Sequence, residues 1–171
     1  SFETGVFDPV WNLHTENGGY LAINDNPSIA QDGDHYVLLA CSPGELSELT
    51  LPIDLAGASN LYLSFYAAVS TAYGDDPSDT VMPTSYTGHG YHVGVSVSVD
   101  GTTWYKAVGL SPLEGVGSSM QHFGLSLDSV MASHGLSYTD DMYIRFSSGS
   151  MSAYPWLSLD LVELFSPSFD F

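Results

Sequence analysis

The pattern of hydrophobic and polar positions is clearest between residues 91 and 110, YHVGVSVSVDGTTWYKAVGL. Four valines between 93 and 99 alternate with small or polar residues. This period of two is typical of a strand that buries one face. Asp100-Gly101 follows, a dipeptide that suits the positive φ angles of a tight turn. The stretch therefore predicts an antiparallel β-hairpin whose valine face packs on the core.

The length of the hairpin loop decides which side chains of the return strand share the valine face. A loop of two or four residues would place Trp104 and Val108 on that face. A three-residue loop would instead turn Tyr105 and Ala107 inward, because a shift of one residue exchanges the two faces of a strand. The sequence leaves both registers open.

Segments of strand length recur along the rest of the chain, separated by Gly, Pro, Asn and Asp. Pro52 cannot donate a hydrogen bond to a ladder, so it predicts an edge or a bulge in its strand. The segment 127–134 predicts a short helix that ends before Gly135. We expect further strands at 1–6, 11–13, 20–23, 35–41, 48–55, 61–69, 121–127, 142–146 and 156–165.

These elements predict an all-β fold, a two-sheet antiparallel β-sandwich with one short helix near 127–134. The length of 171 residues suits a single domain over 1–171, which would bury about 70% of its unfolded surface. The longest irregular stretch is 70–90, and a loop of that length is usually functional or mobile. The tail 166–171, SPSFDF, is a candidate for a segment that is exchanged with, or docked on, a neighbouring copy.

The charge balance narrows the range of partners. The chain has 20 Asp and Glu residues against only Lys106 and Arg145, which gives a net charge of −18. Nucleic acid is excluded as a partner because binding phosphates requires a basic surface. Anionic membrane surfaces are disfavoured for the same reason, and no apolar run is long enough for membrane insertion. The charge suits cation binding, or simply high solubility.

Five segments together make the chain resemble a known family. They are FETG at the start, LTLPIDLAGASNLYLSFY, MPTSYTG, VSVSVDGTTWYKAVGL and the closing LSLDLVEL. The chain resembles, from Phe2 to Leu164, the MAM-like jelly-roll domains of secreted and surface proteins of environmental bacteria. Those domains are similar in layout to carbohydrate-binding jelly rolls. The resemblance implies a jelly-roll sandwich that is secreted, extracellular or on the cell surface.

The chain departs from that family at three positions. Relatives tend to carry an acidic residue where Val93, Trp156-Leu157 and Asp160-Leu161 stand here, so three carboxylate positions have become apolar. If those carboxylates share a site, the site is lost or altered in this chain. If they face solvent, the surface has become more apolar, which is typical of contact surfaces.

Calcium is the cofactor that the sequence suggests. Hard cations take several oxygen ligands from carboxylates and carbonyls. Glu3, Asp32, Asp34 and Asp160 would converge in a jelly roll, and Glu3 and Asp160 match, by resemblance, positions that hold a structural calcium between the first and last strands. The alternative is that these are solvated carboxylates.

The sequence gives no support for catalysis or for a transition-metal site. His89 and His92 stand three residues apart across the junction of a loop and a strand, where they would not face the same way. No Gly-x-Ser-x-Gly elbow, phosphate-binding glycine loop or HExxH motif is present. We therefore expect a protein that is not an enzyme.

Aromatic side chains in or beside loops are candidates for binding a ligand. Tyrosine and tryptophan offer flat apolar faces with a polar group at the edge, which suits sugar rings. The alternative for each is ordinary packing. The candidate ligand-binding residues are Tyr86, His89, Tyr91, Tyr154 and Trp156.

Two functions follow from these observations. The first is a non-catalytic extracellular structural or adhesive protein, stabilised by calcium, that self-associates as a surface or filament subunit. Phe2, Phe169 and Phe171 would then contact a neighbouring copy, or a terminal strand would add to its sheet edge. The alternative is a calcium-dependent carbohydrate-binding module of a larger secreted protein, with a polysaccharide as its partner.

Overall fold

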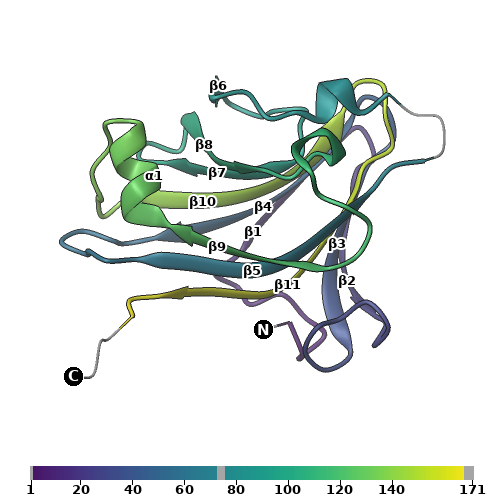
Figure 1. The fold of residues 1–171 in the computed structure, drawn as a ribbon, viewed down its shortest axis with the longest axis horizontal. Helices are drawn as coiled ribbons and strands as arrows, with labels where there is room; N and C mark the ends of the chain where they lie inside the picture. The colour runs from purple at the N-terminus through teal and green to yellow at the C-terminus, as the bar shows by residue number, and fades with distance from the viewer. Residues whose placement is uncertain (1, 73–75, 168–171) are drawn as a thin grey trace.

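The alternating strands form two antiparallel β-sheets that face each other across a hydrophobic core (Figure 1). The computed structural model describes residues 2–72 and 76–167. In spatial order, the six-stranded sheet consists of β1 (Asn12–Glu16), β4 (Glu45–Ile53), β10 (Met142–Ser150), β7 (Gly94–Ser98), β8 (Thr103–Gly109) and β6 (Ser85–Thr87). The five-stranded sheet consists of β2 (Tyr20–Asp25), β3 (His35–Ala40), β11 (Trp156–Phe165), β5 (Tyr62–Ser70) and β9 (Gln121–Ser126).

The inward faces of the two sheets supply the core, as the period of two requires. Phe146 from β10 meets Phe65 from β5 edge to face, with ring centroids 5.3 Å apart. The predicted valine face, with Val95 and Val97, is fully buried in the same cluster. The expected all-β, two-sheet jelly-roll sandwich is therefore confirmed.

Helix α1 (Leu127–Ser133) confirms the predicted short helix. Ser126 precedes it, and its hydroxyl accepts a hydrogen bond from the backbone amide of Ser129, as an N-cap should. Leu127 and Met131 face the core. Two 3-10 turns, η1 (Pro77–Thr80) and η2 (Pro112–Glu114), are the other helical segments that the structure describes.

The predicted first strand over 1–6 is wrong, because residues 2–6 form turns. Gly5 has a φ angle of 69° and donates a backbone hydrogen bond to Phe2, which reverses the chain. Phe2 is only 4% exposed and packs on Phe7 and Trp11 in the core of its own chain. Phe2 is therefore covered within the molecule, which argues against its predicted contact with a neighbouring copy.

Strand β4 carries Pro52 at a local edge, as the sequence predicts. The strand lies between β1 and β10, but its pairing with β1 stops at Asn12 opposite Thr50. Pro52 lies beyond that point and pairs only with Tyr143 of β10. No β1 residue therefore needs a hydrogen bond from the amide that the proline lacks.

Strand β10 runs to Ser150, well past its predicted end at 146. The extension, Ser147, Ser148 and Gly149, pairs with β4 along its whole length. Small residues suit this place, because a Cβ on Gly149 would lie 2.7 Å from the side chain of Leu46. Its lack of large apolar residues hid this part of the strand from the sequence pattern.

Strand β11 contains a bulge that interrupts its alternation. Pairing with β5 shifts between Asp160 and Glu163, and Leu161 takes a left-handed φ angle of 49°. The shift leaves the Asp160 carboxylate fully buried. A pure period of two would instead have assigned Asp160 and Leu161 to fixed opposite faces.

The apolar residues at two of the expected carboxylate positions belong to the core. Val93 and Leu157 are fully buried. They therefore do not form the apolar contact surface that the sequence leaves open. Trp156, beside Leu157, is 54% exposed and points away from the core.

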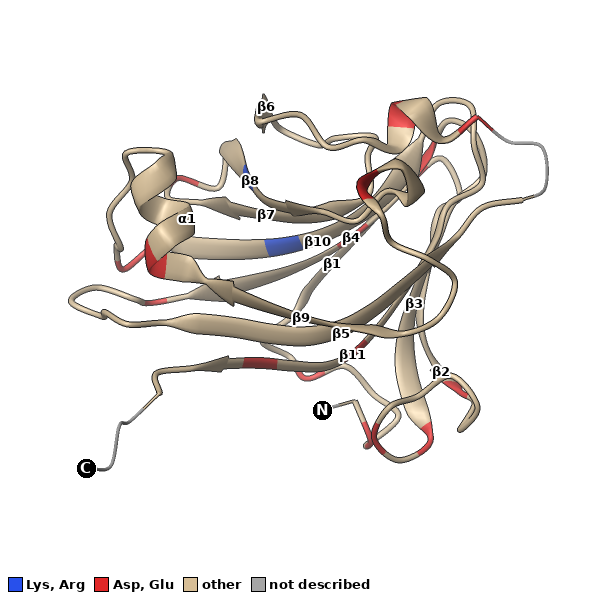
Figure 2. Ribbon diagram, viewed as in Figure 1, with Lys and Arg blue, Asp and Glu red and all other residues tan. Residues whose placement is uncertain are grey.

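The two basic residues both lie in the six-stranded sheet, Lys106 in β8 and Arg145 in β10 (Figure 2). Most of the acidic residues that the structure describes lie in the connections and at strand ends, whereas Glu48 of β4 and both Asp160 and Glu163 of β11 lie within strands. Within the described ranges, no helix has the length and apolarity needed to span a bilayer.

Candidate functional site

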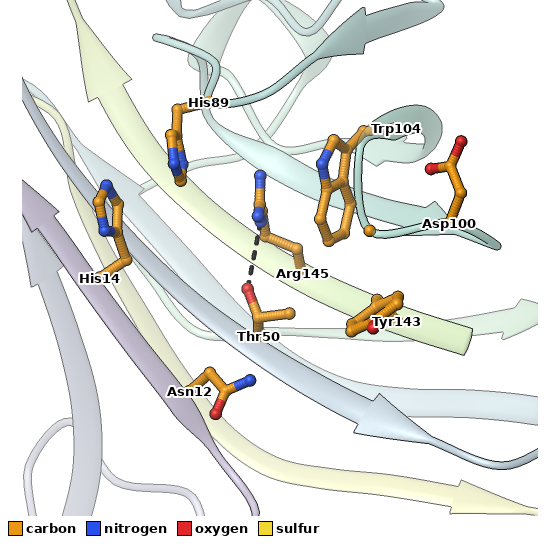
Figure 3. A pocket seen from close by; sticks show the side chains of 9 residues that line it. Asn12, His14, Thr50, His89, Asp100, Trp104, Tyr143 and Arg145 are labelled. Carbon is orange, nitrogen blue, oxygen red and sulfur yellow. Dashed lines mark hydrogen bonds between the residues drawn. The ribbon is translucent and has the colours of Figure 1, made fainter. Parts of the chain in front are cut away.

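The outward face of the six-stranded sheet is polar and carries a hollow of about 330 Å³ (Figure 3). Ladder pairing aligns the side chains, because Thr50 of β4 lies between Asn12 of β1 and Arg145 of β10. These residues alternate with neighbours that face the core. The hollow is lined by Asn12, His14, Thr50, His89, Asp100, Gly101, Trp104, Tyr143 and Arg145.

Arg145 lines this hollow, which we call the cleft, and forms a buried ion pair with Glu48. Glu48 is fully buried and Arg145 is 7% exposed. Nη1 of Arg145 donates to Oε1 of Glu48 at 3.3 Å and to the carbonyl of Gly88 at 2.8 Å. Its Nε donates to the hydroxyl of Thr50 at 3.1 Å. A guanidinium held by three partners is a rigid part of the site.

Trp104 packs flat against that guanidinium, with 3.5 Å between the Arg145 carbon Cζ and the ring centroid. The ring of Tyr143 lies edge to face with that of Trp104, with ring centroids 6.2 Å apart, and Tyr143 is more exposed than Trp104. The indole nitrogen of Trp104 is buried and has no hydrogen-bond partner within the described part of the chain. The cleft therefore combines two aromatic rings with groups that can form hydrogen bonds.

The hairpin register puts Trp104 in the cleft. Val97 lies opposite Tyr105, which corresponds to the three-residue loop of the two alternatives. Asp100 fixes that loop, since its Oδ1 accepts the backbone amides of Thr102 at 2.8 Å and Thr103 at 2.7 Å. Tyr105 therefore turns toward the core, and Trp104 turns outward.

Histidine and glutamate side chains gather at the β1 end of the cleft. His14 of β1 stacks on His89, with ring centroids 4.0 Å apart. Nδ1 of His89 lies 2.6 Å from Oε2 of Glu48, and Nε2 of His14 lies 3.1 Å from Oε1 of Glu16. The expectation that the histidines do not assemble is wrong for His14 and His89, because β1 brings His14 to the loop before β7 (Gly94–Ser98).

His92 points away from this group, as its spacing predicts. Burial lowers its pKa to about 4, and the charges of Arg145 and Lys106 add to the effect. Its ring meets that of Tyr86 edge to face, with ring centroids 4.4 Å apart. His92 is therefore neutral at physiological pH and belongs to the packing behind the cleft.

The five predicted ligand-binding residues lie in three places. His89 lines the cleft, while Tyr86 and Tyr91 support it through hydrogen bonds to Ser96 and Glu16 respectively. Trp156 lies on the other sheet, in a second hollow of about 320 Å³. Tyr154 lies in the connection between β10 and β11.

Two of the four predicted calcium ligands, Glu3 and Asp160, accept hydrogen bonds from backbone amides of the loop at 31–35. Glu3 accepts the backbone amides of Asp34 at 3.0 Å and His35 at 3.3 Å. These bonds, the Asp34 amide foremost, keep the pKa of Glu3 below its usual value. Asp160 accepts the amides of Gln31 at 2.8 Å and Asp32 at 3.2 Å.

The geometry of this loop is not that of a closed metal site. Carboxylates from the start and the end of the chain do meet around 31–35, as the resemblance implies. In the described part of the chain, however, no three of the four predicted ligands have ligand atoms within 4.8 Å of one another. Calcium stays a prediction.

The remaining self-association residues, Phe169 and Phe171, lie outside the described residues. Self-association also stays a prediction. The residues that the sequence analysis missed as site residues are Glu48, which binds Arg145, and every lining residue of the cleft except His89. His14 and Glu16 alternate on one strand face, which is a signal for a shared polar surface, but nothing local in sequence links them to residue 89.

The fold is similar to solved structures, although no protein-family model matches the chain and no curated protein sequence matches it. TmCBM61 in complex with beta-1,4-galactotriose is 17% identical, with a TM-score of 0.57 over 97% of this chain and 94% of that one. The chain has the jelly-roll fold of carbohydrate-binding modules.

Two further carbohydrate-binding modules share this fold. One, from the β-sandwich superfamily and studied for its promiscuous specificity, is 11% identical, with a TM-score of 0.59 over 96% of this chain and 60% of that one. The family 11 module of the cellulosomal cellulase Lic26A-Cel5E of Clostridium thermocellum is 11% identical, with a TM-score of 0.56 over 95% and 90%. The MAM-like part of the resemblance stays a prediction.

Proposed function

We propose that the protein is a non-catalytic carbohydrate-binding module whose ligand lies in the cleft on the six-stranded sheet. The observation that carries this is the meeting of Tyr143 and Trp104 with Asn12, Asp100 and His14 around one hollow. Sugar sites combine aromatic faces with a few placed polar groups. The similarity of the fold to carbohydrate-binding modules supports the same function.

The charge of the molecule favours a neutral polysaccharide as the ligand. A net charge of −18 repels polyuronates and sulfated glycans at long range. Arg145 does not offset this, because its guanidinium is already paired with Glu48. Neutral cell-wall polysaccharides such as galactan and xylan lie outside the cytoplasm, so a ligand of this kind implies an extracellular location for the protein.

Affinity gel electrophoresis followed by calorimetry tests this function. Neutral galactan, xylan and β-glucan are compared with polygalacturonate and alginate. We expect binding to at least one neutral polysaccharide, and we expect Tyr143→Ala to weaken it by about tenfold or more, through the loss of a ring that stacks on sugar.

Trp156→Ala is the matched control, since it removes an exposed aromatic ring from the other sheet. It should leave the affinity unchanged. If the Trp156 variant loses binding while the Tyr143 variant keeps it, the ligand lies in the second hollow and the cleft assignment is overturned. Failure to bind any polysaccharide argues against the function itself.

We also propose that Glu3, Asp32, Asp34 and Asp160 bind a structural calcium ion. Their oxygen-only donors suit the ion, because calcium takes its ligands from carboxylate and carbonyl oxygens. A bound calcium would tie the 31–35 loop to β11 and to the start of the chain. To coordinate one ion, the loop at 31–35 has to move so that the four carboxylates come closer to one another.

Melting in calcium and in EDTA tests this site. At 100 times its dissociation constant, calcium would add about 2.7 kcal/mol, which corresponds to a rise in Tm of about 5–10 °C for a domain of this size. Asp160→Asn should remove the difference between the two conditions. Equal melting temperatures in calcium and EDTA for the unaltered protein would show that no such ion stabilises the fold.

A further inference from the structure

Three side chains that can bind a metal converge at the β1 end of the cleft. They are His14 of β1, Glu48 of β4 and His89 of the loop between β6 and β7. One ligand atom from each lies within 4.8 Å of the others, and no other group of this kind occurs among the described residues. We propose that these three residues bind a divalent transition-metal ion of the zinc class.

To close around an ion, the stacked rings of His14 and His89 have to turn so that a nitrogen of each points to one position. Two ligand atoms at 2.0–2.1 Å from a tetrahedral zinc ion lie roughly 3.3 Å apart. His89 Nδ1 and Glu48 Oε2 are 2.6 Å apart, a hydrogen-bond distance, so the ion would replace the shared proton and move the two atoms slightly apart. The two imidazole rings lie 14° from parallel. Rotation of the half-exposed histidine rings can bring both nitrogens to one ion over the fixed carboxylate.

The neighbouring charges leave one carboxylate oxygen for the ion. Arg145 binds Oε1 of Glu48, and Oε2 faces His89. Nε2 of His14 contacts Glu16, so a neutral His14 that donates this hydrogen has a lone pair on its other ring nitrogen. A carboxylate that orients a histidine in this way is a common outer partner in metal sites.

Access and donor type decide the class of metal. The side chains of His14 and His89 are 40% and 41% exposed, while that of Glu48 is fully buried. An ion would therefore enter from the cleft and keep open positions toward it. Two imidazole nitrogens with one carboxylate favour zinc, cobalt, nickel or copper over calcium and magnesium, which prefer oxygen ligands. This site is separate from the calcium site proposed around 31–35.

Calorimetry on the chelator-treated full chain, titrated with zinc chloride, tests the proposal. We expect one equivalent to bind, and no comparable binding of calcium chloride at this position. His14→Ala and His89→Ala should each weaken zinc binding by at least about tenfold. His122→Ala is the matched control, because His122 lies on β9 of the other sheet and contacts Ser64. It should leave the affinity unchanged.

Ring nitrogen chemical shifts of the histidines provide a second measurement that does not depend on a variant folding. With zinc, the shifts of His14 and His89 should move and those of His122 should not. Absence of saturable zinc binding, or equal affinity in all three variants, overturns the proposal. No glycan is present in either experiment, so the result is independent of the proposed carbohydrate binding.

Discussion

Replacing Glu48 by glutamine is expected to lower the free energy of unfolding by about 3 kcal/mol. Arg145, 7% exposed, would keep its charge in the sheet face without its carboxylate partner. An uncompensated buried charge is among the costliest single changes. The expected loss falls at the lower end of the usual range for two reasons. The side-chain oxygen of the new glutamine can still accept one hydrogen bond from Arg145, and Thr50 and Gly88 still accept their hydrogen bonds from it.

Urea unfolding followed by circular dichroism measures this loss. A double variant, Glu48→Gln with Arg145→Met, is the control. It removes both charges, so no uncompensated charge stays buried, and it should recover part of the stability. A single Glu48 variant that unfolds at the same urea concentration as the unaltered protein would mean that the pair is solvated.

Replacing Trp104 by alanine is the second large change, with an expected loss of about 3–5 kcal/mol. The indole is 1% exposed and lies between Arg145 and Tyr143, so its removal opens a cavity in the floor of the cleft. Affinity for polysaccharide should fall as well, because Tyr143 and Arg145 lose the surface that positions them.

Trp104→Phe separates the two effects. The smaller ring still offers a face to Arg145, so we expect it to retain most of the stability and part of the affinity. Both variants are compared by urea unfolding and by calorimetry with the best polysaccharide ligand. A nearly neutral Trp104→Ala would indicate that the indole is not packed beneath the guanidinium.

The strands whose residues alternate cleanly could be predicted from the sequence. Strand β11 has the predicted bounds, and β3, β5 and helix α1 lie within a residue or two of theirs. In β5, β11 and α1, large apolar residues repeat with the period of the element, and in β3 they form a continuous run, so local sequence carries the signal. The predicted strand at 142–146 is shorter than β10, because Ser147, Ser148 and Gly149 carry no such signal.

The cleft could not be predicted, because its contacts come from the order of strands in the sheet. Glu48 and Arg145 are 97 residues apart, and they meet only because β4 and β10 are neighbours. His14 reaches His89 for a similar reason. The face to which Trp104 points depends on whether the hairpin loop has an odd or an even number of residues. The side chain of Asp100 fixes the loop by accepting hydrogen bonds from two backbone amides.

The placement of the two basic residues also determines how the folded protein meets a protease. Trypsin cleaves after lysine or arginine, and this chain offers only Lys106 and Arg145. Arg145 lies in β10, between β4 and β7. Lys106 pairs with Ser96 of β7, and its backbone amide donates a hydrogen bond to the carbonyl of Thr84. Neither can extend into a protease cleft while the sheet is intact. Cleavage by trypsin therefore reports the opening of this sheet, and the folded molecule should persist in fluids rich in such proteases.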